Sequence, residues 1–113
     1  MTTIRVMVKL APYAIEYDSE IPQQLDAIEP NYHSLIRAVI EEQLRFEPEI
    51  ETRNRKPLRR PIAWGATWEL RFGPDNHFRV FYRVDHGAHR VHVLAIGTKE
   101  RSRLFVGGVE IRL

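Results

Sequence analysis

The chain has 113 residues, 43% of them hydrophobic, with no cysteine and a formal net charge of +2. This length predicts a single domain spanning residues 1–113. The lack of cysteine excludes disulfides and thiolate metal sites, and it makes the cytoplasm the expected location. No apolar run approaches the roughly 18 residues of a membrane span, and the first residues lack a signal-peptide pattern, so we expect no membrane contact.

The two halves of the chain carry opposite charge. Residues 1–51 contain four Lys or Arg against ten Asp or Glu, whereas residues 52–113 contain thirteen against five. Five cations fall within eight positions of the second half: Arg53, Arg55, Lys56, Arg59 and Arg60. A basic segment of this kind attracts a polyanion, although a fold in which the halves pair their charges would also account for it.

The N-terminal part predicts strands followed by a short helix. Residues 4–10 alternate and are rich in β-branched side chains, and residues 13–17 predict a second short strand. Ser19 is a candidate N-cap for a helix that runs to about Ile28, with Pro22 tolerated in its first turn.

A longer helix is predicted between residues 32 and 46. Its apolar residues recur at three- and four-residue intervals, which places them on one stripe, and Pro48 ends the element. The stripe consists of Leu35, Ile36, Val39, Ile40 and Leu44.

Three strands with short turns follow, at residues 67–72, 78–84 and 90–96. The third is apolar on nearly both faces and therefore predicts a central strand. Consecutive strands joined by short turns form an antiparallel meander. We expect an α+β fold: an N-terminal strand, two helices, and then an antiparallel meander sheet with the helices packed on one face.

Charged side chains alternate with large apolar ones in the first two meander strands. Glu69, Arg71, Arg79 and Arg83 fall on the face away from the apolar residues. Arginines from adjacent strands would form a positively charged sheet face, bordered by the basic segment. Such a face suits the binding of a single-stranded RNA backbone. The residues leave open a second interpretation, a solvated face whose arginines pair with neighbouring carboxylates.

Other chemistry has little support in the sequence. His86, His89 and His92 have a regular spacing, but Gly87 predicts a turn in which the rings need not converge, and zinc needs three or four ligands at fixed distances. We therefore expect no metal and no cofactor. The serines lie in no nucleophile-elbow pattern, and "VGGVE" matches no phosphate-binding loop.

Three segments in order, "RNRKPL", "LRFGPDNHFRVFYRV" and "IGTKERSRLF", resemble the RelE/ParE superfamily of bacterial toxins. These proteins are the toxin halves of type II toxin–antitoxin modules. The resemblance, to RelE-like members in particular, covers roughly residues 13–106.

The resemblance implies a function as well as a fold. RelE-like toxins enter the ribosomal A site and cleave mRNA without a metal, because the 2′-hydroxyl of the RNA attacks the adjacent phosphate. It thus implies an endoribonuclease (mRNA interferase) that inhibits translation and whose partners are a cognate antitoxin, the ribosome and mRNA. ParE-like members act on DNA gyrase, so a non-enzymatic toxin or binding module with such a protein target is the alternative.

The resemblance also implies roles for five residues. Arg79 matches the arginine that grips the scissile phosphate, and Arg71 matches a basic position on the preceding strand. Glu69 is a candidate base. Lys99 stands where these toxins have an arginine, and it keeps the charge but cannot form the bidentate hydrogen bonds of a guanidinium. Phe105 stands where RelE has a tyrosine, and it cannot transfer a proton. The expected RNA-binding residues are Arg53, Arg55, Lys56, Arg59, Arg60, Arg83, Arg101 and Arg103.

Overall fold

The computed structural model describes residues 11–60 and 62–112. The strand expected at residues 4–10 lies outside the described residues. In chain order the elements are β1 (Ala14–Tyr17), α1 (Ile21–Asp26), α2 (His33–Leu44), β2 (Arg55–Pro57), β3 (Trp68–Phe72), β4 (Phe78–Asp85), β5 (Arg90–Glu100), β6 (Arg103–Val106) and β7 (Val109–Ile111). The α+β order expected from the sequence is confirmed.

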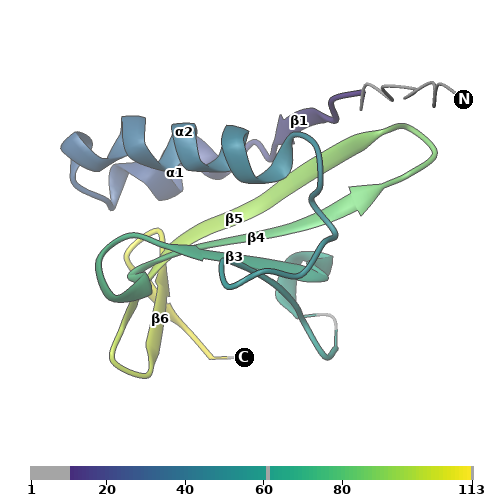
Figure 1. Ribbon diagram of the computed structural model, residues 1–113. Coiled ribbons are helices and arrows are strands. Elements are labelled where there is room, and N and C mark those ends of the chain that lie inside the picture. Colours follow the sequence, from purple (N-terminus) through teal and green to yellow (C-terminus); the bar gives the residue numbers. More distant parts are fainter. Residues whose placement is uncertain (1–10, 61, 113) are drawn as a thin grey trace, which may run out of the picture.

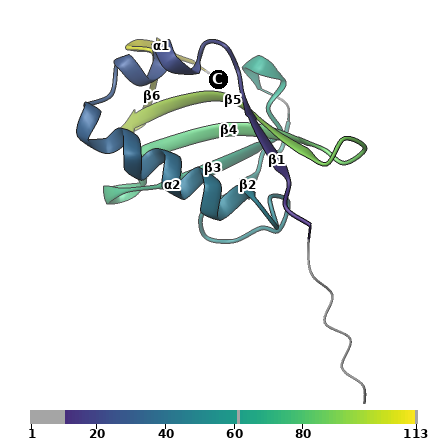
Figure 2. The same ribbon diagram turned by 90° about the horizontal axis from the view of Figure 1, so that it is seen from above.

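All seven described strands form one sheet around β5. The order β2-β3-β4-β5-β6-β7 is antiparallel throughout, so the meander extends beyond the three expected strands at both ends. The other edge of β5 is shared: β1 runs parallel to its first half, and β6 pairs with its last four residues. The expectation of a central strand is therefore confirmed (Figure 2).

The helix α1 fills the gap between β1 and β6. Ile96 lies between the two paired halves of β5, and its backbone N–H donates to the Gln24 side-chain oxygen at 2.8 Å. Gln24 is buried on α1. A side chain thus provides the acceptor that a neighbouring strand would otherwise supply.

Both helices pack on one face of the sheet, as expected (Figure 1). The buried residues of α2 are Ile36, Ile40 and Leu44, which meet sheet residues such as Val80. Leu35, expected in the same stripe, is 43% exposed because it lies at the border of the buried face. No helix of residues 11–60 and 62–112 is long and apolar enough to cross a membrane.

The boundaries of the helices differ slightly from those expected. Helix α1 is preceded by Glu20, not by Ser19, and no side chain caps its N-terminus. The Asp18 carboxylate instead accepts a hydrogen bond from the Glu20 backbone N–H at 3.0 Å. The helix therefore begins at Ile21, one residue later than a Ser19 N-cap predicts. Pro22 does lie in the first turn.

The opposite face of the sheet carries a second, smaller core. Its fully buried centre is Phe81, which projects from β4 between Arg79 and Arg83. Leu104 and Val106 of β6 pack in the same cluster. The positively charged face expected from the sequence is therefore not continuous, because the C-terminal strands pack over part of it and bury apolar side chains there.

Glycine permits the close approach of β6 and the tight turn to β7. A Cβ at Gly97 would lie 2.3 Å from the Phe105 carbonyl oxygen, so only glycine fits at this crossing. Gly107 and Gly108 both have positive φ and join β6 to β7 as a two-residue hairpin turn. The glycines of "VGGVE" therefore serve the backbone of this hairpin.

Replacing Gln24 tests whether its side chain is the acceptor that the Ile96 backbone N–H needs. We expect Gln24→Ala to lower the free energy of unfolding by about 1–3 kcal/mol, because the buried Ile96 N–H loses its acceptor. Gln23→Ala, at the exposed neighbouring position of α1, is the control and should stay within about 0.5 kcal/mol. Urea denaturation measures both, and equal stability of the two variants would contradict this account.

Candidate active site

Antiparallel pairing brings the charged residues of β3 and β4 together. Arg71 lies directly opposite Arg79, and Glu69 lies opposite Phe81. Directly paired residues point to the same side of a sheet, so both arginines project from the face away from the helices. Like charges placed opposite each other repel, and this arrangement needs a compensating anion.

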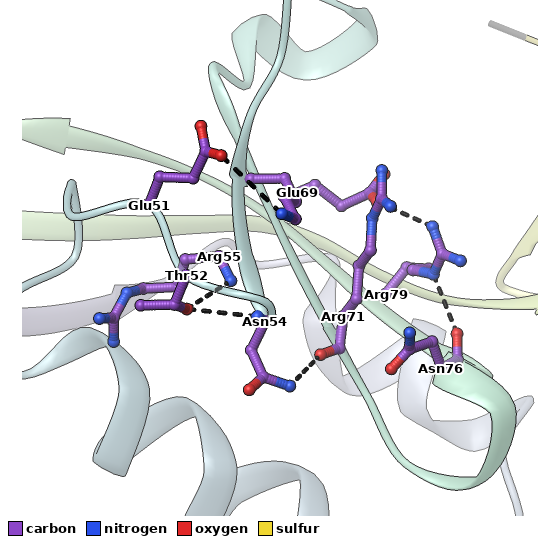
Figure 3. Close-up of polar contacts among 9 residues, drawn as sticks. Glu51, Thr52, Asn54, Arg55, Glu69, Arg71, Asn76 and Arg79 are labelled. Carbon is purple, nitrogen blue, oxygen red and sulfur yellow. Dashed lines mark hydrogen bonds and ion pairs between the residues drawn. The ribbon is translucent and has the colours of Figure 1, made fainter.

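Glu69 supplies that anion (Figure 3). Its Oε1 accepts from Arg79 Nη1 at 2.8 Å and from Arg71 Nε. The Nε of Arg79 donates to the Asn76 carbonyl oxygen at 3.0 Å, which anchors the guanidinium at a second point. Glu69 and Arg79 are only 6% and 9% exposed, whereas Arg71 is half-buried. The carboxylate therefore holds two guanidiniums in fixed positions.

Lys99 joins this group from β5 and helps to separate two clefts. One cleft, of about 360 Å³, contains Glu69 and Phe81, and we call it the Glu69 cleft. The other, of about 450 Å³, contains Tyr32, His77 and Arg101, and we call it the His77 cleft. Arg79 and Lys99 line both clefts and form a cationic ridge between them, the Arg79–Lys99 ridge.

Phe105 does not reach this group. On β6, Leu104 pairs with Lys99 whereas Phe105 pairs with Thr98, so Phe105 lies on the other face of the sheet. Its ring lies 5.4 Å from the Arg103 guanidinium carbon, and Phe105 lines neither cleft. Arg103 pairs with Glu110 at 2.7 Å at the border of the Glu69 cleft. Period-two alternation along β6 explains why Phe105 is turned away.

The basic segment separates into exposed cations and one buried cation. Arg53, Arg59 and Arg60 are exposed, and Lys56 lies 3.8 Å from Glu51. Arg55 is only 8% exposed, so the expectation that it lies on an open basic surface is wrong.

The reason is a set of internal acceptors for the Arg55 side chain. Its Nε donates to the Ile50 carbonyl oxygen at 2.8 Å, and its Nη1 donates to the backbone and side-chain oxygens of Gln43 at 2.8 and 3.0 Å. Arg55 thereby fastens β2 to the end of α2. Its role is structural.

Two other expected RNA-binding residues lie near opposite ends of β5. Arg101 lines the His77 cleft and has a left-handed backbone, with φ of 58°. Arg83 projects from the same face as Arg79, but it lies beyond Phe81 and lines a separate pocket with Glu16. Arg83 is thus apart from the Arg79–Lys99 ridge.

The three clustered histidines diverge in the structure. His86 pairs with Glu49, His89 stacks on Tyr13 with ring centroids 3.8 Å apart, and His92 faces Glu16 at 3.4 Å. No group of three or more His, Asp or Glu side chains in the described part of the chain is placed to hold a metal ion.

Two arginines of the basic segment provide a paired test. We expect Arg55→Ala to lower the free energy of unfolding by about 2 kcal/mol or more, because two backbone carbonyls and the Gln43 side chain lose a charged donor. Arg53→Ala, at an exposed position, should change it by less than about 0.5 kcal/mol. Thermal and urea unfolding measure the difference, and an Arg55→Ala protein as stable as the parent would refute the structural role.

Comparison with known proteins supports the fold. No protein-family model matches the sequence, and no curated protein matches it. Among solved structures, a chain of the toxin–antitoxin complex RelBE2 from Mycobacterium tuberculosis superposes with a TM-score of 0.61 and 23% identity. The match covers 83% of this chain and 97% of that one. The protein described here therefore has a RelE-like fold.

Proposed function

We propose that this protein is a RelE-like toxin that inhibits translation by metal-independent, ribosome-dependent cleavage of mRNA. The observation that carries the proposal is the group of Arg71, Arg79 and Lys99 around Glu69 on the face away from the helices. The RelE-like fold and the resemblance of "LRFGPDNHFRVFYRV" and "IGTKERSRLF" to RelE-like toxins support it.

The electrostatics of this group favour phosphate binding. Arg71 and Arg79 both pair with one carboxylate, and Lys99 lines the cleft beside it, so these four residues carry an excess of positive charge. Phosphoryl transfer depends mainly on positioning and on stabilising the charge of the phosphoryl oxygens. Arg79 is held at both Nη1 and Nε before any substrate arrives, so its orientation costs little on binding. Lys99 adds a mobile point charge.

The proposed reaction uses the RNA as its own nucleophile. The 2′-oxygen attacks the adjacent phosphorus while the bond from phosphorus to the 5′-oxygen breaks, which leaves a 2′,3′-cyclic phosphate. Glu69 lines the cleft beside the ridge and accepts the 2′-hydroxyl proton.

The exposed cations of the basic segment serve binding in this proposal. Arg53, Arg59 and Arg60 are free to contact phosphates of mRNA or ribosomal RNA without reading sequence. A cognate antitoxin is the proposed protein partner, because a solved structure with this fold is a toxin–antitoxin complex. An acidic antitoxin segment would complement the basic face.

Lys99 variants test the nuclease activity. The protein is induced in a bacterial host and cellular mRNA ends are mapped. We expect growth arrest with new 5′ ends, a loss of about 100-fold in cleavage for Lys99→Met, and retained cleavage for Lys99→Arg, because the transition state needs the cation. Arg37→Met, an exposed cation on α2, is the matched control.

The same experiment separates the rival function. Growth arrest without new mRNA ends would overturn the nuclease proposal and leave a toxin with a protein target. Phe105 in place of tyrosine and Lys99 in place of arginine are the features that favour this rival. A supercoiling assay with purified gyrase would then decide, because only a ParE-like toxin lowers the activity of that enzyme.

A further inference from the structure

His77 lies against the Arg79–Lys99 ridge, at the residue before β4. The Lys99 backbone N–H donates to the His77 carbonyl oxygen at 2.7 Å. The His77 ring returns the contact, with Nδ1 3.0 Å from the Lys99 carbonyl oxygen. The ring also meets the edge of Phe78, with centroids 5.3 Å apart and an interplanar angle of 69°. The imidazole is therefore fixed in orientation.

These contacts determine which ring nitrogen is available for chemistry. A carbonyl oxygen only accepts hydrogen bonds, so Nδ1 carries a proton and donates it to Lys99. Nε2 is then the ring nitrogen that takes no part in this contact. The half-buried His77 lines the cleft that also holds Arg79 and Lys99. The other charged residues of that cleft are Asp75, Glu100 and Arg101.

Glu69 and His77 flank the ridge on its two sides. Glu69 lines one cleft, His77 lines the other, and Arg79 and Lys99 separate them. In an in-line displacement the attacking and leaving oxygens lie on opposite sides of phosphorus. A phosphate seated with its reacting bonds across the ridge would present its attacking oxygen to one cleft and its leaving oxygen to the other.

We propose that His77 is the general acid of the cleavage reaction, an inference that rests on the function proposed above. Glu69 removes the proton from the 2′-hydroxyl, the bond from the 2′-oxygen to phosphorus forms, and the bond to the 5′-oxygen breaks. The Nε2 proton of the His77 imidazolium passes to that 5′-oxygen, which leaves as a hydroxyl. The reaction consumes no other reactant, and the enzyme ends with neutral His77 and protonated Glu69.

The assignment accounts for Phe105. A phenylalanine carries no exchangeable proton, and Phe105 lies on the other face of the sheet. Glu69 acts as the base in this reaction, so a second group must supply the proton to the 5′-oxygen. Among the described residues, His77 is the histidine that lines a cleft together with Arg79 and Lys99.

Two substitutions separate proton transfer from anchoring. His77→Asn keeps a side-chain N–H near the position of Nδ1 and hence the contact to the Lys99 carbonyl, but it lacks the Nε2 that would donate the proton. His77→Ala removes both. His86→Asn, at an exposed histidine on the distant β4–β5 turn, is the matched control. Melting curves check that each variant is folded.

The assay is single-turnover cleavage of mRNA on purified ribosomes, with the A-site codon taken from cleavage sites mapped in cells. We expect both His77 variants to cleave at least about 100-fold more slowly than the parent, the usual range for a general acid. A second mRNA replaces the leaving 5′-oxygen with sulfur, because a thiolate leaves without a proton. On this substrate the variants should approach the parent rate.

The outcomes distinguish the two proposals. Cleavage by His77→Asn at the parent rate, or an equal loss on the oxygen and sulfur substrates, would overturn the general-acid role and leave the nuclease function standing. If the parent protein cleaves no ribosome-bound mRNA, both proposals fail together.

Discussion

The Glu69 carboxylate between two arginines is the interaction on which the rest of the proposed site depends. The register of β3 and β4 places Arg71 opposite Arg79. Arg79 is almost fully buried, and a buried guanidinium without a partner would be strongly destabilising. One oxygen of Glu69 accepts from both guanidiniums, so it offsets the repulsion between them, neutralises the buried charge of Arg79 and fixes both side chains. The site is therefore preorganised by the same contact that makes its charges tolerable within the fold, so stability and function are coupled at Glu69.

The central strand β5 links the two layers of the molecule. Its first half pairs with β1 and supports the helices, whereas its last residues pair with β6 and carry Lys99. The Gln24 side chain accepts from the Ile96 N–H between these halves, and Gly97 allows β6 to approach β5 closely. Lys99 also exchanges hydrogen bonds with His77, so the end of β5 positions residues of both clefts.

Arginine serves three different purposes within this small chain. Arg55 is a structural donor to α2, Arg79 is a buried part of the site, and Arg53 is an exposed cation. The number of hydrogen-bond acceptors within reach, and not the residue type, separates these roles. The basic surface available to a polyanion is consequently smaller than the charge of the segment indicates.

Periodicity along the sequence by itself determined the order of elements, the helix-facing core and the common face of Arg71 and Arg79, because these depend on alternation within one strand or helix. Only the tertiary structure decided what meets across the sheet. Glu69 binds an arginine ten residues away, His77 meets a residue 22 positions away, and Arg55 finds its acceptors on α2. The second core, and the pairing of Leu104 rather than Phe105 with Lys99, follow from strand register, which no local pattern contains. Pairing between distant strands is set by the packing of the whole chain, and so it escaped a residue-by-residue prediction.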